Sequence, residues 1–279
     1  MPHIEPHLAF SEYGHSGGRL VIYFHGAPGS VAEASIFERF AKDHNLRLVC
    51  LDRFAVPPSF ERKTYYQFLA DEIERLAGAG PVDLIGFSIG AHVGLEVAAI
   101  LGDRVRRIHL VAPAAPLTAG DFIDHMAGGQ IFGLALKMPF VFRMLTRFQT
   151  LLASIAPGQL VGMIFASAAG RDSALLQEDD FNRYITAVLR QCFRGRANGY
   201  IRDIANYVIW QGECIRDISG LSVVSLWHGS NDNWSPFAMS LYLADAIPAA
   251  APVQMLKGAS HYSCLLEAAP KIFANAAKS

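Results

Sequence analysis

The sequence predicts an α/β fold in which a mostly parallel central sheet carries helices on both faces. Short apolar runs alternate with longer helical patterns along most of the 279 residues, which is typical of strand-helix-strand units. The runs are continuously apolar, as expected for strands that are covered on both sides. A single long stretch, residues 117–220, interrupts this alternation.

Each expected element follows from its local pattern. Six apolar runs have the length and composition of buried strands, and they occupy residues 20–24, 46–51, 82–87, 107–111, 222–227 and 252–256. Amphipathic patterns between and after these runs predict helices at residues 30–44, 64–78, 89–101, 235–247 and 263–277. We therefore expect residues 1–116 and 221–279 to form one α/β core.

Residues 117–220 show helical stretches separated by Gly or Pro and no strand-like run followed by a helix. A structureless loop of that length is not expected inside a compact domain. We therefore predict that this segment is a helical cap, or lid, inserted between two strands of the core.

Composition limits the classes of partner. The formal net charge is −1, with 52% hydrophobic and 18% charged residues, so the chain as a whole produces no field that gathers nucleic acid or an anionic membrane. A small neutral or weakly charged molecule is the expected partner. The sequence leaves the oligomeric state open between monomer and homodimer.

Targeting and redox signals favour a cytoplasmic location. The N-terminus has no basic segment followed by an apolar one, so no secretory signal is predicted. The four cysteines lie far apart without C-x-x-C spacing, which predicts reduced thiols rather than a zinc site or a disulfide framework. The apolar stretch 131–145 is interrupted by Lys137, Pro139 and Arg143 and is shorter than the about 20 residues of a spanning helix, so no transmembrane segment is predicted.

Four loops with chemically useful side chains follow expected strands. HGAPGS follows residues 20–24, Ser88 follows 82–87, HGSNDNWSP follows 222–227, and His261 follows 252–256 after a short turn. Ligands of open α/β sheets bind at the carboxyl ends of the strands, so these four loops are expected at one edge of the sheet.

On these residues the chain resembles the α/β-hydrolase superfamily. The resemblance is carried by HGAPG at 25–29, GFSIG at 86–90, HGSND at 228–232 and GASH at 258–261. It implies the α/β-hydrolase fold and a triad in the chain order Ser88, Asp232, His261. Ser88 would be the nucleophile, His261 the general base, and Asp232 the residue that orients His261.

The same resemblance implies an oxyanion hole formed by the backbone N–H groups of Ala27 and Ile89. Around these groups, His25 and Gly26 are expected to support the first loop. Gly86 and Gly90 would remove side chains that obstruct the turn at Ser88. After the strand at 46–51, many relatives continue as Asp-Arg-x-Gly-x-Gly, whereas residues 52–59 here read DRFAVPPS, which predicts an altered loop beside the pocket.

Several of these residues have a second interpretation. The carboxylate of Asp232 could instead cap the helix that starts near Ser235, a role common for aspartate in turns. Asp121 and Asp124, which follow the strand at 107–111, are the alternative acids for the triad. His125 could contact substrate, but nothing in its spacing indicates a ligand, so a structural role is expected.

The cap sequence is rich in aromatic residues and methionine, at Phe122, Met126, Phe132, Met138, Phe140, Phe142, Met144, Phe148, Met163 and Phe165. We expect most of them to pack the cap against the core and a subset to line an apolar pocket above Ser88. A run of arginines could bind an anionic group of the substrate or form a solvated helix face, and it comprises Arg183, Arg190, Arg194, Arg196 and Arg202. No metal site and no nucleotide-cofactor motif are predicted.

These patterns predict a serine hydrolase that forms an acyl-enzyme on a small or medium, largely apolar ester, lactone or thioester. The same resemblance also permits a carbon-carbon bond hydrolase, an aminopeptidase or an acyl transferase. An alternative of another class is a ligand receptor without hydrolytic activity, since a fold does not determine a function.

Overall fold

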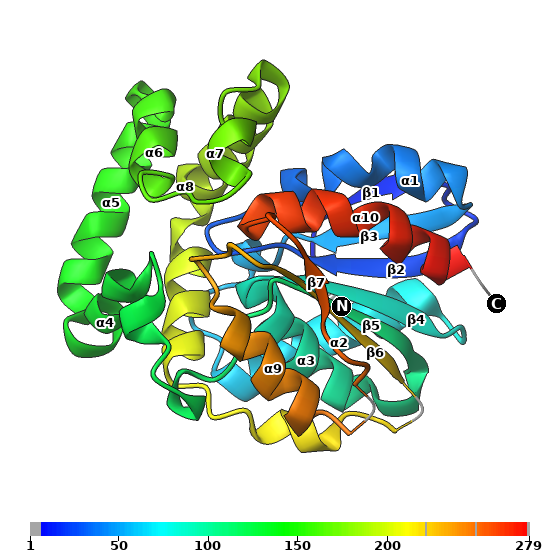
Figure 1. The fold of residues 1–279 in the computed structure, drawn as a ribbon. Coiled ribbons are helices and arrows are strands. Elements are labelled where there is room, and N and C mark those ends of the chain that lie inside the picture. The colour runs from blue at the N-terminus through cyan, green and yellow to red at the C-terminus, as the bar shows by residue number, and fades with distance from the viewer. Residues whose placement is uncertain (1–6, 221, 249, 278–279) are drawn as a thin grey trace, which may run out of the picture.

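Residues 7–220, 222–248 and 250–277 are described by the computed structural model, and within them seven strands form one sheet (Figure 1). Their spatial order is β1-β3-β2-β4-β5-β6-β7. The strands are β1 Phe10–Gly14, β2 Arg19–Phe24, β3 Leu46–Leu51, β4 Val82–Phe87, β5 Val105–Val111, β6 Val223–Gly229 and β7 Gln254–Leu256. The six predicted strands are all present, and their ends differ from the prediction by two residues or fewer.

Strand pairing confirms the mostly parallel sheet. Strands β2 to β7 pair in parallel, whereas β1 pairs antiparallel with β3, with Phe10 opposite Leu51 and Gly14 opposite Arg47. Strand β1 is not predicted from the sequence, because it is an edge strand whose residues are all partly or fully exposed and carry no continuous apolar run.

Helices cover both faces of the sheet, as predicted. The helices of the α/β core are α1 Glu38–Asp43, α2 Arg62–Ala77, α3 Ile89–Leu101, α9 Phe237–Ala246 and α10 His261–Ala277. Figure 1 shows α1 and α10 on one side of the sheet and α2, α3 and α9 on the other. Strand β4 is buried along its whole length, because both of its faces contact helices.

The described residues between β5 and β6 form only helices and loops. This helical insertion, residues 117–220, contains α4 Gly129–Lys137, α5 Pro139–Ile155, α6 Pro157–Ile164, α7 Asp172–Leu175 and α8 Asp179–Val208, together with short 3-10 turns. Helix α8 is interrupted at Arg194 and Gly195, where the backbone leaves the helical conformation. Figure 1 shows α8 between the sheet and the outer helices α4, α5 and α6.

Two of the predicted arginines attach α8 to the loop that follows β3. Arg202 is buried and donates hydrogen bonds of 2.7 Å to the carbonyl oxygens of Val56 and Arg53. Arg196 donates a 2.8 Å hydrogen bond from Nε to the Asp52 carboxylate. Because these side chains bind the protein itself, they join the helical insertion to the altered loop at residues 52–59.

Candidate active site

Ser88 lies at the tight turn between β4 and α3. Its backbone has φ 55° and ψ −126°, a conformation that costs about 1–3 kcal/mol in a residue other than glycine. The turn requires small neighbours: a Cβ at Gly90 would lie 2.1 Å from the Phe24 carbonyl oxygen, and one at Gly86 would lie 2.6 Å from Cα of Ala91. The two predicted glycines therefore permit the close approach of α3 to the sheet.

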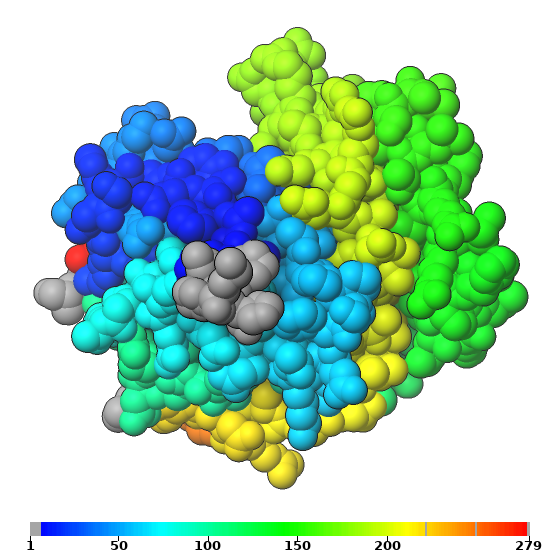
Figure 2. All heavy atoms as spheres, turned by 180° about the vertical axis from the view of Figure 1, so that it is seen from behind, coloured from blue at the N-terminus to red at the C-terminus, as the bar shows by residue number. Residues whose placement is uncertain are grey.

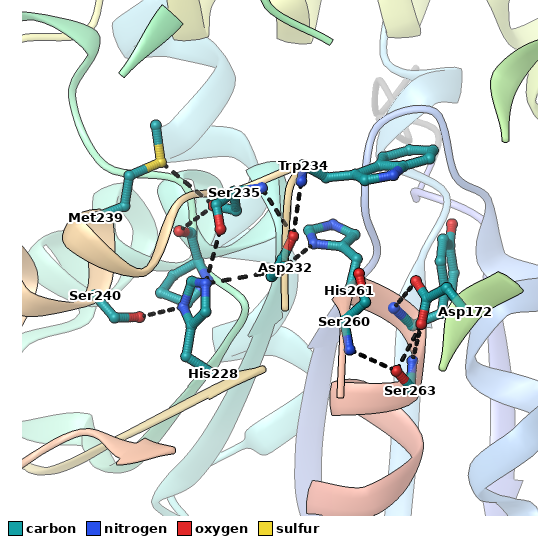
Figure 3. A network of polar contacts seen from close by, with 12 residues as sticks. Asp172, His228, Asp232, Trp234, Ser235, Met239, Ser240, Ser260, His261 and Ser263 are labelled. Carbon is teal, nitrogen blue, oxygen red and sulfur yellow. Dashed lines mark hydrogen bonds and ion pairs between the residues drawn. The ribbon is translucent and has the colours of Figure 1, made fainter. Parts of the chain in front are cut away.

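His261 and Asp232 form a buried pair. Nδ1 of His261 lies 2.8 Å from Oδ2 of Asp232, and the two side chains are 3% and 0% exposed (Figure 3). The other carboxylate oxygen accepts the backbone N–H groups of Trp234, at 2.8 Å, and Ser235, at 3.0 Å. Asp232 thus contacts the histidine and also holds its own turn, but it does not cap the following helix, because that helix begins at Phe237 with Pro236 at its N-cap and no side-chain hydrogen bond there.

The pair shifts the pKa values of both partners. Burial disfavours the imidazolium of His261, but the Asp232 carboxylate outweighs this effect and raises the pKa of His261 above its ordinary value. Burial would raise the pKa of Asp232, but the charge and hydrogen bond of His261 hold it below its ordinary value. The geometry therefore favours an ionised carboxylate beside an imidazole that can accept a proton.

The neighbouring His228 holds the loop that carries Asp232. Nδ1 of His228 lies 2.7 Å from the Ser240 hydroxyl, and Nε2 lies 2.8 Å from the Ser235 carbonyl oxygen (Figure 3). Burial lowers the pKa of His228. Both nitrogens of this neutral ring therefore have hydrogen-bond partners, and the buried ring stabilises the loop that carries Asp232.

The other candidate acids lie elsewhere. Asp121, Asp124 and His125 are exposed, and none of them has a hydrogen bond or ion pair with His261 among the described residues. Of the three acids considered from the sequence, Asp232 is the one in contact with His261.

The His261 ring contacts two aromatic residues that lie close to Ser88 in the sequence or in the cavity lining. The ring of Phe87, which precedes Ser88, lies 4.7 Å from the His261 ring between centroids. The indole of Trp234 stacks on the imidazole, with centroids 5.5 Å apart, and lines the same cavity as Ser88. No hydrogen bond joins Ser88 Oγ and His261 among the described residues. Such catalytic contacts are often long in substrate-free enzymes.

Ala27 and Ile89 line the same cavity as Ser88. Neither backbone amide donates a hydrogen bond to another described residue. Ile89 is the first residue of α3, so its amide belongs to the positive end of the helix. Two such amides can bind an oxygen that acquires negative charge.

Two buried charged residues hold Gly26, next to Ala27. The Gly26 N–H donates a 2.8 Å hydrogen bond to the Glu33 carboxylate, and Arg53 donates a 3.2 Å hydrogen bond to the Gly26 carbonyl oxygen. His25 also lies 2.8 Å from that oxygen through Nδ1. These contacts determine the direction of the peptide group that precedes Ala27.

Neither Glu33 nor Arg53 is predicted as a site residue from the sequence. Glu33 also accepts a 2.7 Å hydrogen bond from the Tyr23 hydroxyl, and burial raises the pKa of Glu33 to about 7. Arg53 forms a buried 2.7 Å ion pair with Asp203 of helix α8. The sequence gives only a weak indication of their role: Glu33 and Arg53 are each a single charged residue close to an otherwise apolar segment.

Asp172 is a third residue that the sequence does not single out. Its buried carboxylate accepts hydrogen bonds from the backbone N–H groups of Tyr262, at 2.9 Å, and Ser263, at 2.8 Å, and from the Ser263 hydroxyl, at 2.6 Å (Figure 3). A carboxylate at the start of a helix stabilises the free amides there. Asp172 thus links the helical insertion to the helix that begins with His261.

A cavity of about 290 Å³ lies above Ser88, between the sheet edge and the helical insertion. No Asp, Glu, Lys, Arg or His is among the described residues that line it. Its apolar walls include Ile131, Phe132 and Leu145, and its polar groups include the side chains of Gln130 and Gln149. Such a lining suits an uncharged, largely apolar molecule.

The aromatic and methionine residues of the helical insertion divide between interior and surface. Met126, Phe132 and Met163 line the cavity, as expected for a subset. The expectation that most of the ten pack inside is wrong, because five of them are exposed: Met138, Phe140, Met144, Phe148 and Met163. The apolar periodicity of α5 is present, but one apolar face of this helix points to solvent.

The described residues contain neither a cluster of metal-ligating side chains nor a helix that could span a membrane. Within residues 7–220, 222–248 and 250–277, no group of three or more His, Cys, Asp or Glu side chains could hold a metal ion. In the same ranges no helix combines the length and the apolar character that crossing a bilayer requires.

The sequence and the fold of this chain are both similar to those of known proteins. A sequence profile of the alpha/beta hydrolase family matches residues 21–276. Similar solved structures include an esterase from Exiguobacterium antarcticum, at 13% identity and TM-score 0.68, covering 98% of this chain and 96% of that one. A bromoperoxidase from Bacillus anthracis is 17% identical with TM-score 0.65, covering 96% and 92%. A lipase-esterase related protein from Clostridium acetobutylicum is 14% identical with TM-score 0.63, covering 97% and 98%. No curated protein sequence matches the chain.

Proposed function

The chain belongs to the alpha/beta hydrolase family, and from this premise we propose that it is a serine hydrolase that forms an acyl-enzyme at Ser88. The observation that carries the proposal is the buried 2.8 Å contact between His261 and Asp232, beside the turn that bears Ser88. The similar solved structures, all below 20% identity, support the fold and do not identify the reaction.

In the proposed reaction, Ser88 Oγ attacks the carbonyl carbon of the substrate while Nε2 of His261 takes its proton. Asp232 holds Nδ1–H of His261, so Nε2 is the nitrogen that can accept a proton. His261 then returns the proton to the leaving group. Water, activated by the same imidazole, hydrolyses the acyl-enzyme and restores Ser88.

The N–H groups of Ala27 and Ile89 bind the oxygen of the tetrahedral intermediate. Loss of one such donor costs about 3–4 kcal/mol of transition-state stabilisation in other enzymes. Here Glu33 and Arg53 are positioning residues, because they hold both polar groups of Gly26 and thereby orient the Ala27 amide.

The substrate class follows from the cavity. Its apolar, uncharged lining favours a small or medium, largely apolar ester, lactone or thioester. An aminopeptidase would need a group to bind the ammonium of its substrate, and no carboxylate is among the described lining residues. This observation favours the ester-type substrate over the peptide.

The helical insertion, residues 117–220, is the lid of this proposed enzyme, and residues 1–116 and 221–279 are its core. Helices α4, α5 and α6 contribute cavity residues such as Ile131, Leu145 and Met163, so the insertion forms the wall opposite the sheet edge. A wall of this kind excludes water from the reacting groups.

Covalent labelling and turnover test the proposal together. We expect a fluorophosphonate probe to label the wild-type protein and p-nitrophenyl esters of graded chain length to be hydrolysed. Ser88→Ala should abolish both. The matched control is Ser154→Ala, because Ser154 is an exposed serine on the outer helix α5.

The alternatives predict different results. A ligand receptor would bind an apolar ligand tightly, without turnover, and Ser88→Ala would not change that binding. A carbon-carbon bond hydrolase would be labelled at Ser88 but would turn over diketones in preference to esters. Labelling of Ser88→Ala at the wild-type rate would refute the assignment of the nucleophile.

A further inference from the structure

A stripe of exposed apolar side chains runs along helix α5. Phe140 and Ile155, near its two ends, are 73% and 70% exposed. From Val141 onward, successive members lie three or four residues apart, so they share one face of the helix. The α5 stripe consists of Phe140, Val141, Met144, Phe148, Leu151 and Ile155.

Neighbouring helices extend this apolar surface. Leu136 at the end of α4, Met138 before α5 and Met163 of α6 are also exposed. In Figure 2 the green atoms of this segment form one flank of the molecule, and the atoms of α8 lie between them and the part that holds the sheet. Continuous apolar patches on a protein surface commonly mark an interaction site.

The segment that bears the α5 stripe carries charge of one sign. No Asp or Glu occurs in residues 125–171, whereas Lys137, Arg143 and Arg147 in this stretch are exposed. None of these three cations forms an ion pair with a described residue. The net charge of −1 for the whole chain conceals this local excess of positive charge.

We propose that the α5 stripe and the cations Lys137, Arg143 and Arg147 form a docking surface for the interface of an anionic phospholipid membrane. An amphipathic helix that combines apolar side chains with Lys or Arg lies in the plane of such an interface, with its apolar face among the acyl chains. The cations then meet the lipid phosphates. The helix does not cross the bilayer.

A second copy of the chain is a poorer occupant of this surface. In a two-fold contact each copy presents the same patch to the other. The cations Lys137, Arg143 and Arg147 of one copy would then face a patch with the same positive charge, and residues 125–171 of that patch contain no carboxylate to neutralise them. An anionic lipid surface satisfies both the apolar side chains and the cations.

The helix that bears the docking surface also forms part of the cavity wall. Met163, in the helix α6 that packs against α5, is 38% exposed and also lines the cavity above Ser88. The opposite face of α5 contributes Leu145 and Gln149 to the cavity wall. An apolar molecule dissolved in the membrane would therefore meet the cavity next to the docking surface. The docking itself goes beyond the proposed hydrolase function and does not require it.

Vesicle sedimentation tests the docking. We expect the full-length protein to sediment with vesicles of phosphatidylcholine mixed with phosphatidylglycerol, and to bind pure phosphatidylcholine vesicles about tenfold more weakly. Phe140→Ser with Phe148→Ser should weaken binding to the mixed vesicles at least about tenfold, because two large apolar side chains no longer enter the lipid. Arg143→Gln with Arg147→Gln should weaken it by a similar factor.

Matched controls keep the result specific. Leu241→Ser and Met255→Ser remove exposed apolar side chains of the core and should leave vesicle binding unchanged. Circular dichroism verifies that each variant is folded, and hydrolysis of a water-soluble ester should match the wild type in the Phe140→Ser, Phe148→Ser variant. If Ser88→Ala loses ester hydrolysis but still binds vesicles, the docking proposal is tested separately from the proposed hydrolase function.

Three outcomes would overturn the docking. The first is wild-type protein that stays in the supernatant with the mixed vesicles. The second is binding that both double variants retain. The third is a wild-type dimer, seen by light scattering, that Phe148→Asp converts to a monomer while vesicle binding is absent, because the stripe would then serve a second copy of the chain.

Discussion

The Asp172 carboxylate of the helical insertion accepts a 2.6 Å hydrogen bond from the hydroxyl of Ser263 in helix α10. Ser263 lies two residues after His261, and its hydroxyl also accepts the backbone N–H of Ser260 at 2.7 Å. The start of α10, and with it the position of the imidazole, therefore depends on a side chain from a segment about 90 residues earlier in the chain.

Asp172→Asn should destabilise the protein and slow the reaction. The amide retains one acceptor but brings an NH2 group toward backbone donors, so about 2 kcal/mol of the free energy of unfolding should be lost. Displacement of His261 should lower kcat about tenfold with little change in KM. Urea denaturation and steady-state kinetics measure the two effects.

Asp121→Asn is the control for this change, because Asp121 is an exposed aspartate of the same insertion. Equal unfolding midpoints for Asp172→Asn and the wild type would show that the contact with α10 contributes nothing.

Activity should depend on the protonation of His261. Only the neutral imidazole can accept the Ser88 proton, so kcat/KM should fall as the pH drops through the pKa of His261, which the Asp232 carboxylate holds above its ordinary 6.5. In Asp232→Asn burial remains but the carboxylate charge does not, so the midpoint should move to lower pH. The rate should also fall by roughly 10³- to 10⁴-fold.

A pH-rate profile and an NMR titration of the His261 ring check this prediction. Asp124→Asn, a change at an acid without contact to His261, should leave the midpoint unchanged. A midpoint that is the same in Asp232→Asn and the wild type would rule out the electrostatic role of Asp232.

Glu33 should make stability decrease as the pH rises toward neutrality. Burial raises the pKa of Glu33 from 4.5 to about 7, so the folded state binds a proton that the unfolded state has released in that range. The free energy of unfolding should therefore decrease between about pH 4.5 and pH 7, by up to about 3 kcal/mol from this group. Glu33→Gln should remove this decrease, because its amide cannot ionise.

Chemical denaturation at a series of pH values measures the difference between wild type and Glu33→Gln. Glu38→Gln alters an exposed glutamate that pairs with Lys42 and should preserve the wild-type pH dependence. Parallel stability curves for wild type and Glu33→Gln would contradict the raised pKa.

The size of the cavity should determine the preferred acyl chain. Leu145→Ala enlarges the cavity from the inner face of α5, so kcat/KM for longer p-nitrophenyl esters should rise relative to the shortest ester. Leu151→Ala truncates the same residue type on the outer face of α5 and should leave the preference unchanged. A ratio of long to short ester that does not change in Leu145→Ala would mean that the acyl group binds elsewhere.

Local patterns in the sequence were sufficient to predict the parallel sheet and to predict that its functional loops lie at the same edge. Continuous apolar runs indicate strands buried on both faces, and parallel strands bring their carboxyl ends to one edge. For that reason the sequence could predict that Ser88, Asp232 and His261 lie at one edge of the sheet, although they are far apart in the chain. The edge strand β1 was not recognised, because an exposed strand lacks the apolar signal.

Only the tertiary structure decided which long-range contacts surround those residues. Glu33, Arg53 and Asp172 hold the neighbours of the candidate site through contacts that depend on how distant segments pack, and no local pattern encodes them. Likewise, the period of α5 identifies its apolar positions, but a period does not determine which of them face solvent. That choice depends on the packing of α5 against α8, which leaves Phe148 and its neighbours at the surface.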